Sequence, residues 1–260
     1  MSERVIVPNW PDLPPFIGAL TTLRTGGVSL APYDDGAGSG TGGFNLATHV
    51  GDQIDHVMEN RHLLAHYLPS EPQWLSQVHG TTVVRLDEKS SDTDNPTADA
   101  SFTTQTNVIC AVQTADCLPV LLCDATTKVV AAVHAGWRGL ASGVIENTLA
   151  KMQDCGAKSD NVMAWLGPAI GPLQFEVGEE VKDQFMAIDL SASAAFKARE
   201  GQRGKFLADI CLLAELRLLK AGVNKIARGN FCTVSQANRF YSYRRDGVTG
   251  RMASLIWIKH

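Results

Sequence analysis

Apolar and polar positions along the chain follow two periodicities, one typical of strands and one typical of helices. Apolar, β-branched runs predict strands over residues 81–86, 107–113, 118–124, 128–134, 164–170, 230–234 and 253–258. Apolar residues at helical spacing predict helices over residues 54–68, 140–152, 177–186 and 206–221. Because the two types interleave, we expect an α/β or mixed α+β fold, a sandwich built on one large mixed sheet with flanking helices.

The strands on either side of the turn Ala125–Thr127 are close enough in sequence to form a hairpin. Both strands are continuously apolar, which is typical of strands covered on both faces. Residues facing each other across this hairpin have numbers that sum to about 252, which places Leu118 opposite His134. The thiol of Cys117 and the imidazole of His134 therefore meet at one end of the hairpin.

Three side chains of this region form a candidate metal centre. Cys117 and His134 both stand where a strand pattern stops, and His79 does the same before Gly80. A thiolate and two imidazoles suit zinc with an open fourth position. Zinc held by three protein ligands is typical of catalysis, because the metal lowers the pKa of water in that position.

The residues leave other interpretations open. Cys117 could be a nucleophile, with His134 as its base and Asp116 or another group orienting the imidazole. His62 and His66 stand four positions apart on the first predicted helix and could also chelate a metal. No HExxH glutamate accompanies that second pair, so a solvated helix face is the favoured interpretation there.

Arginines are the second chemical signal. Guanidinium groups bind phosphate well because they present a planar fork of donors. Arg24 and Arg138 stand beside glycines, which permit a close backbone approach. A further cluster near the C-terminus contains two tyrosines that could stack on a base and the arginines Arg239, Arg244, Arg245 and Arg251. The alternative interpretation of this cluster is a basic surface loop balanced by acidic residues elsewhere on the surface.

Composition narrows the class of protein. The 260 residues are 45% hydrophobic and 19% charged, the balance of a globular chain, and we expect one domain over residues 1–260. With a net charge of -4 the chain lacks the dense positive charge that nonspecific nucleic-acid binding needs, so no nucleic-acid partner is expected.

The glycine-rich stretch 34–43 lacks the Gly-Lys-Ser/Thr ending of a phosphate loop. It indicates a surface loop, with a lid over a site as the alternative.

The expected cellular compartment follows from the absence of a membrane-spanning run and of an apolar signal segment in the sequence. No apolar run approaches the roughly 18 residues of a membrane span. The N-terminus carries Glu3, Arg4 and then prolines in place of an apolar signal segment, which predicts a cytoplasmic protein. Six cysteines without a CxxC pair indicate neither a zinc ribbon nor a thioredoxin-type motif.

These motifs resemble those of a known family, the YfiH-like or laccase-domain proteins described as purine nucleoside phosphorylases. The matching segments run in order along nearly the whole chain: RTGGVS (24–29), NLATHVGD (45–52), NR (60–61), SQVHG (76–80), ADA (98–100), TADCLPVLLCD (114–124), HAGWRGL (134–140), LGPAIG (166–171), FEVG (175–178) and YRRDGVTGR (243–251).

The resemblance implies a single α/β domain similar to cysteine-hydrolase-like sandwiches, with zinc held by His79, Cys117 and His134. It implies phosphorolysis of adenosine, inosine, guanosine and methylthioadenosine, and deamination of adenosine. Another family label, peptidoglycan-editing factor, implies an amidase acting on a cell-wall precursor. On the resulting hypothesis Asp116 carries protons in deamination, and substrate is held by Arg24, Asn45, Arg138 and Arg244.

The laccase label can be tested against the composition. A four-copper oxidase needs about ten histidines, and this chain has seven, so that chemistry is excluded. Copper bound at the His-Cys-His centre could still give weak phenol oxidation. A binding module with structural zinc is a further alternative, although structural zinc usually has four protein ligands. Oligomeric state does not follow from these patterns.

Overall fold

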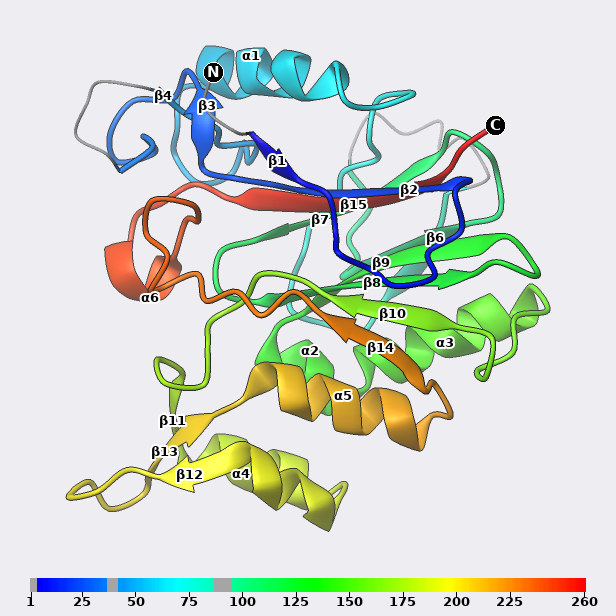
Figure 1. Cartoon of the computed structure of the whole chain (residues 1–260). Helices are drawn as coiled ribbons and strands as arrows, with labels where there is room; N and C mark the ends of the chain where they lie inside the picture. Colours follow the sequence, from blue (N-terminus) through cyan, green and yellow to red (C-terminus); the bar gives the residue numbers. More distant parts are fainter. Residues whose placement is uncertain (1–3, 37–41, 87–94) are drawn as a thin grey trace.

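The secondary structure of the chain lies in stacked layers (Figure 1). The structure, a computed structural model, describes residues 4–36, 42–86 and 95–260. A single helix covers one face of a four-stranded sheet, whose other face packs on a six-stranded sheet, and further helices cover the far side of the six-stranded sheet. Part of the glycine-rich stretch, residues 37–41, lies outside the described residues.

The four-stranded sheet is antiparallel and joins the two ends of the chain, because a strand near each end runs beside the other. Its spatial order is β1 (Val5–Ile6), β2 (Ile17–Thr22), β15 (Met252–Ile258) and β7 (Ile109–Thr114). The six-stranded sheet is mixed and has the order β14 (Lys225–Arg228), β10 (Met163–Leu166), β8 (Leu118–Asp124), β9 (Val129–Ala135), β6 (Ala100–Thr103) and β5 (Val83–Arg85).

Two smaller sheets lie beside this sandwich. One pairs β3 (Thr25–Gly27) with β4 (Gly42–Gly43), and the other orders β11 (Glu176–Gly178), β13 (Lys205–Ala208) and β12 (Phe196–Ala198). The helices are α1 (Ile54–Ala65), α2 (Trp137–Ser142), α3 (Val144–Asp154), α4 (Glu179–Met186), the 3₁₀ helix η1 (Leu190–Ala195), α5 (Ile210–Lys220) and α6 (Tyr243–Asp246). Within the described residues, no helix is both long and apolar enough to cross a membrane.

The burial of β8 explains why its sequence lacks the usual alternation of apolar and polar positions. Every residue of the strand is buried. Val120 and Leu122 belong to the core under the helices, whereas Leu121 and Cys123 belong to the core between the two sheets. Both faces of the strand are therefore apolar because successive side chains point to opposite faces and both faces are covered.

The predicted α/β class is confirmed, but the expectation of one large sheet is wrong. β7 and β8 follow each other in sequence and belong to different sheets. The link between them contains Asp116, whose backbone has a φ of 84°. A left-handed residue at this point turns the chain sharply, so the next strand enters the second sheet. The cysteine-hydrolase-like detail of the expected sandwich remains a prediction.

The predicted hairpin is present with a register shifted by one residue. His134 pairs with Pro119, and Leu118 pairs with Ala135. The facing numbers therefore sum to 253 instead of about 252. The shift leaves Cys117 and His134 at the same end of the hairpin.

Local differences from the predicted elements have identifiable causes. The predicted helix 206–221 begins only at Ile210, because Asp209 caps it by accepting a hydrogen bond from Leu212 N, and residues 205–208 form β13. The predicted helix 140–152 starts earlier and is divided at Gly143, whose φ is 97°. Residues 230–234 form no strand and contribute only a bridge from Cys232 to Ala169.

Candidate functional site

The candidate site lies at one edge of the six-stranded sheet, where four segments meet. β5, β6 and β8 begin at this edge, and β9 ends there. The edge opens into a cavity of about 380 Å³, within the size range of small-molecule sites. Its lining residues are His49, Gln77, His79, Gln113, Thr114, Ala115, Asp116, Cys117, His134, Trp137, Arg138, Ile170, Phe175, Ile210, Tyr243, Arg244 and Arg251.

His79, Cys117 and His134 converge in this cavity. Their ligand atoms all lie within 4.8 Å of one another. The Cys117 Sγ atom is 3.7 Å from Nε2 of His79. The rings of His79 and His134 stand edge to face, with centroids 4.8 Å apart. The three side chains that the sequence singled out are thus brought together, although they come from separate segments of the sheet edge.

The buried carboxylate of Asp99 holds both histidines in place. One of its oxygens, Oδ1, accepts hydrogen bonds from Nδ1 of His134 at 2.8 Å and from the backbone N of His79 at 2.9 Å. The other accepts from the backbone N of Gly80 at 2.6 Å. Because Nδ1 of His134 is occupied in this way, Nε2 is the atom left to face the cavity.

Asp99 was not among the residues selected from the sequence. Its one signal in the sequence was the ADA segment at residues 98–100, which is among the segments that match the family. That pattern does not say which histidine the carboxylate faces, since β6 and β9 become neighbours only in the folded sheet. The structure therefore names Asp99 as the group that orients His134, the role left open between Asp116 and another residue.

The space between the three ligands fits a metal ion. A Cβ atom added to Gly136 would lie 3.0 Å from Cys117 Sγ and 3.5 Å from Nε2 of His134, so the cradle is open only because a glycine stands there. Zinc bound tetrahedrally to sulfur and nitrogen would separate those atoms by about 3.6 Å, close to the observed spacing of Cys117 and His79. The cluster can therefore hold a metal.

The backbone of the site is locally strained. His79 has a φ of 61° and Asp116 a φ of 84°, both in the left-handed region that non-glycine residues rarely adopt. Such residues cost roughly 1–3 kcal/mol each and cluster at functional sites. Both positions flank the cavity, so the surrounding hydrogen bonds hold the ligands in a geometry that the free chain would avoid.

The cluster is strongly polarised even without metal. Burial raises the pKa of Cys117, but hydrogen bonds from His134 and His79 and their charge outweigh burial and bring this pKa to about 6. Burial lowers the pKa of His134, but the hydrogen bonds to Asp99 and Cys117 outweigh it and raise this pKa to about 9. Near neutral pH the metal-free pair is therefore a thiolate facing an imidazolium, and the thiolate is ready to bind a metal.

The metal-free protein is expected to alkylate at Cys117 with an apparent pKa near 6, well below the ordinary thiol value of about 8.5. The sign follows from the lowered pKa: the reactive thiolate persists at pH 7 and is lost as the pH falls through 6. Iodoacetamide rates measured between pH 5 and 9, with Cys117→Ala as background, test this. Reaction that rises only above pH 8 would contradict it, and zinc should protect the thiol.

The arginines that line the cavity come from two sides. Arg138 at the start of α2 stacks on Trp137, with 4.6 Å between the guanidinium carbon and the ring centroid. Arg244 of α6 donates hydrogen bonds to the backbone carbonyls of Gln174 and Glu176. Arg251 follows α6 in sequence. Asp116 is the one carboxylate among the described residues of the lining, so cations prevail there.

Asp116 is anchored rather than isolated. Its carboxylate accepts a hydrogen bond from Thr233 Oγ1 at 2.5 Å and another from the backbone N of Arg244 at 2.6 Å. Its backbone carbonyl accepts from Ile170 N. Asp116 thus ties the segment carrying Arg244 to the residue next to Cys117.

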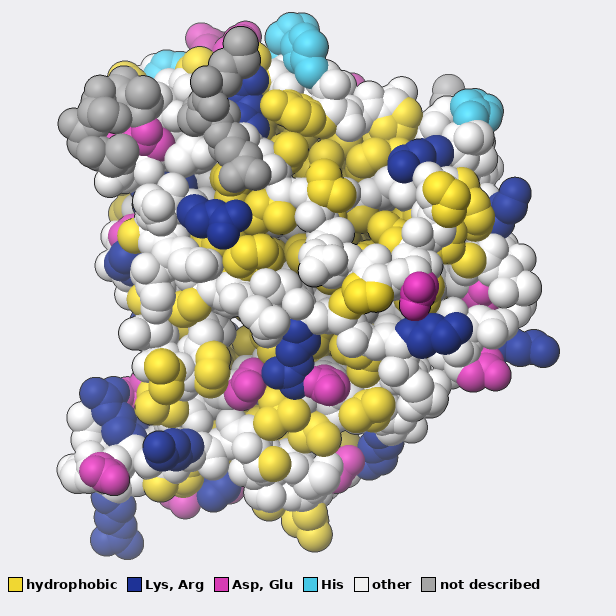
Figure 2. Space-filling model, in the orientation of Figure 1, with side chains coloured by type: hydrophobic (Ala, Val, Ile, Leu, Met, Phe, Trp, Pro, Cys, Tyr) yellow, Lys and Arg dark blue, Asp and Glu magenta, His cyan; other side chains and the backbone are white. Residues whose placement is uncertain are grey.

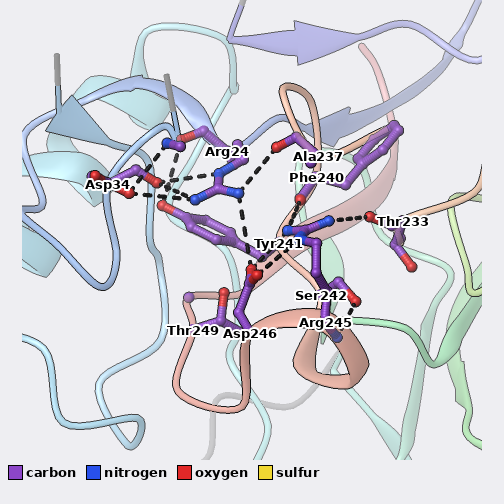
Figure 3. Close-up of polar contacts among 12 residues, drawn as sticks. Arg24, Asp34, Thr233, Ala237, Phe240, Tyr241, Ser242, Arg245, Asp246 and Thr249 are labelled. Carbon is purple, nitrogen blue, oxygen red and sulfur yellow. Dashed lines mark hydrogen bonds and ion pairs between the residues drawn. The ribbon is translucent and has the colours of Figure 1, made fainter. Parts of the chain in front are cut away.

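Arg24 does not line the cavity, contrary to expectation. Arg24 is only 5% exposed, and its guanidinium lies over the ring of Tyr241 (Figure 3). It donates hydrogen bonds to the backbone carbonyls of Asp34 and Ala237 and pairs with the carboxylates of Asp34 and Asp246. These contacts occupy its donors, so Arg24 joins the loop before residue 36 to the segment after Thr233.

Asn45 also lies outside the lining. Its Oδ1 accepts hydrogen bonds from the backbone N of Ala47 and of Arg251, and its Nδ2 donates to Asp52 and to the carbonyl of Ala47. With these partners Asn45 holds the backbone of Arg251 and has no role at the cavity surface.

Arg24→Met is therefore expected to act on stability rather than on substrate. Removing this largely buried guanidinium should cost about 2–3 kcal/mol, because Asp34 loses its ion-pair partner and the carbonyls of Asp34 and Ala237 lose their donors. Denaturant unfolding measures the loss, and a metal titration should show unchanged zinc affinity. An unchanged stability with a raised KM for phosphate would instead return Arg24 to the substrate site.

The second histidine pair does not form a site of this kind. His62 on α1 and His66 directly after this helix are both exposed, and their ring centroids are 5.4 Å apart. Figure 2 shows histidine side chains standing out from the surface above α1. The interpretation of a solvated helix face agrees with this placement.

Comparison with known proteins gives a consistent assignment. A family model described as multi-copper polyphenol oxidoreductase laccase matches residues 18–259. The purine nucleoside phosphorylase YfiH of Shigella flexneri is 51% identical over 258 residues, which cover 98% of this chain and 99% of that protein. The protein of the same name from Escherichia coli K12 is 49% identical over the same shares of both chains.

A solved structure agrees with the fold. The crystal structure of a Neisseria meningitidis protein superposes with a TM-score of 0.89 at 44% identity, covering 99% of this chain and 100% of that one. The resemblance noted from the sequence motifs is thereby confirmed. Since the family model and these relatives span nearly the whole chain, the protein belongs to the multi-copper polyphenol oxidoreductase laccase family, together with the YfiH proteins.

Proposed function

We propose that the protein is a zinc-dependent purine nucleoside phosphorylase that also deaminates adenosine. The observation that carries this proposal is a single cavity lined both by the His-Cys-His cluster, which could hold a metal, and by a group of arginines. The names of the Shigella and Escherichia relatives support phosphorolysis as the reaction. The proposed substrates are phosphate and the nucleosides adenosine, inosine, guanosine and methylthioadenosine.

The lining offers places for a purine and for phosphate. Trp137, Phe175 and Tyr243 present aromatic rings, and Ile170 and Ile210 extend the apolar surface. A purine has two apolar faces, which such rings can stack on. The arginines of the lining supply the positive charge that phosphate requires.

The phosphorolytic step exchanges one bond at the ribose for another. An oxygen of phosphate bonds to C1′, the bond between C1′ and the purine N9 breaks, and N9 keeps the electron pair. N9 then takes up the proton that phosphate releases, which gives a free purine and ribose 1-phosphate. The arginines stabilise the phosphate oxygens during this exchange because their charge is fixed in place before the reaction.

His79, Cys117 and His134 would hold the zinc, which when bound supplies a Lewis acid and lowers the pKa of water at its open position. Asp99 keeps Nε2 of His134 facing the cavity and holds the backbone at His79. In deamination Asp116 is the proposed proton carrier, since it lines the cavity beside Cys117. Its bonds to Thr233 and Arg244 fix its position for that role.

The test is adenosine turnover by zinc-loaded protein with and without phosphate, with adenine resolved from inosine. Adenine and ribose 1-phosphate that form only with phosphate would support the phosphorylase. Inosine in either buffer would support the deaminase. Formation of neither product would contradict the proposal.

A second candidate function is favoured by one observation, the chain of contacts from Cys117 through His134 to Asp99. A thiolate, an imidazole and an orienting carboxylate are the parts of a cysteine nucleophile. On this alternative the protein is an amidase acting on a cell-wall precursor, without a metal requirement. A chelator would then leave activity intact while an alkylating agent destroyed it, the opposite of what zinc dependence predicts for the chelator.

A further inference from the structure

The three arginines of the cavity differ in how their guanidinium groups are engaged. Arg244 is exposed, and its Nη1 and Nη2 donate to the carbonyls of Gln174 and Glu176 at 3.2–3.4 Å. Arg138 is exposed as well and lies on the face of Trp137. Both side chains are therefore accessible to solvent. Arg251, in contrast, is half-buried.

The position of Arg251 is set by its own backbone and by Asn45. Its backbone N donates to Oδ1 of Asn45 at 2.9 Å. Its Nη1 donates to the carbonyls of Thr249 and Gly250 at 2.9 and 3.1 Å. Within the part of the chain that the structure describes, Nε and Nη2 have no hydrogen-bond partner. One edge of the guanidinium fork is thus fixed while other donors remain available to a ligand.

Arg251 is half-buried in the lining of the same cavity as Cys117, His79 and His134. Burial lowers its pKa from the ordinary arginine value, and the nearby Cys117 and Asp116 partly restore it. His49 also lines the cavity, and its partial burial together with the charges of Arg251 and Arg61 lowers its pKa. An arginine stays charged under these conditions. A partly desolvated cation with available donors attracts an anion more strongly than an exposed one.

We propose that Arg251, positioned by Asn45, is the residue that binds the phosphate beside the metal cluster, and that Arg138 and Arg244 serve the rim of the cavity. This inference rests on the proposed function, because it assigns one substrate of phosphorolysis to one side chain. It also accounts for Asn45, which acts through Arg251 and is a positioning residue. Phosphate held there would leave the apolar lining of Trp137 and Phe175 to the purine.

The test compares Arg251→Gln, Arg251→Lys and Arg244→Gln with the unchanged protein, all zinc-loaded. Two readouts are used: the KM for phosphate during adenosine phosphorolysis, and the rise in melting temperature that inorganic phosphate produces. We expect Arg251→Gln to raise the KM for phosphate about 10- to 100-fold and to abolish the thermal shift. Zinc content and the KM for adenosine should stay unchanged. Arg251→Lys should recover part of the effect by keeping the charge.

Arg239→Gln is the matched control. Arg239 comes from the same C-terminal region, lies over the rings of Phe231 and Phe240, and is outside the lining. It should keep both readouts.

The outcomes separate this inference from the proposed function. If Arg251→Gln keeps its response to phosphate while Arg244→Gln loses it, the assignment to Arg251 is overturned and phosphorolysis stands. If phosphate stabilises the protein only through Arg251 but no nucleoside is cleaved, the anion site stands and phosphorylase activity fails. If phosphate produces no thermal shift in the unchanged protein, the inference is overturned.

Discussion

Replacing Cys117 with alanine is expected to abolish zinc retention and nucleoside phosphorolysis together while the fold stays intact. Cys117 supplies the thiolate of the cluster, and its Sγ lies 3.7 Å from Nε2 of His79. Removing a ligand should cost more than the roughly 10- to 100-fold that loss of an outer hydrogen-bond partner costs in metal affinity. Elemental analysis of the purified variant and a ribose 1-phosphate assay measure the two effects.

Cys123→Ala is the matched control for that experiment. Cys123 is a fully buried thiol of β8, and burial raises its pKa to about 12, so it is chemically inert at neutral pH. Its replacement should lower stability by about 1 kcal/mol through lost packing and leave zinc and activity in place. Zinc-loaded, active Cys117→Ala protein would contradict a metal-centred mechanism.

The second large effect is expected at Asp99. In Asp99→Asn, one carboxylate oxygen becomes an amide nitrogen, which cannot accept a hydrogen bond, so either the bond from Gly80 N or the bonds from His79 N and His134 Nδ1 are lost. Zinc affinity should fall roughly 10- to 100-fold, because His134 is no longer held in one orientation. The buried donor left without a partner should also cost about 1–3 kcal/mol of stability. Competition with a chromophoric chelator and guanidinium unfolding give the two numbers.

Asp124→Asn offers a control of equal burial at the far end of β8. The Asp124 carboxylate is also buried and accepts hydrogen bonds from the backbone N of Thr126, Thr127 and Lys158. Its replacement should cost stability and leave zinc affinity unchanged. If Asp99→Asn binds zinc as tightly as the unchanged protein does, the carboxylate does not orient the ligand.

Local patterns predicted the parts of the fold that depend on neighbours in sequence. The hairpin of β8 and β9 followed from a short turn between two apolar runs, and it carried Cys117 and His134 to one end. The division into two sheets was missed, since it depends on the sharp turn at Asp116 and on β15, which inserts between β2 and β7 from the other end of the chain.

The same limit explains the errors at the site. Arg24 was selected because it precedes the glycines at 26 and 27. Its guanidinium instead pairs with residues more than 200 positions away, Ala237 and Asp246. Asn45 belongs to a motif of the family, and its amide turned out to hold the backbone of Arg251. Asp99 faces His134 only through the pairing of β6 with β9. Residue type indicated the chemistry, while long-range pairing decided which side chains reach the cavity.

The most direct measurement of the central claim is phosphorolysis after removal and return of the metal. The protein is stripped with a chelator, shown by elemental analysis to be metal-free, and reloaded with one equivalent of zinc or of copper. We expect ribose 1-phosphate formation from adenosine to vanish on stripping and to return with one zinc per chain, because the proposed metal centre consists of one cluster, His79, Cys117 and His134. Full phosphorolysis by the metal-free protein would contradict that claim.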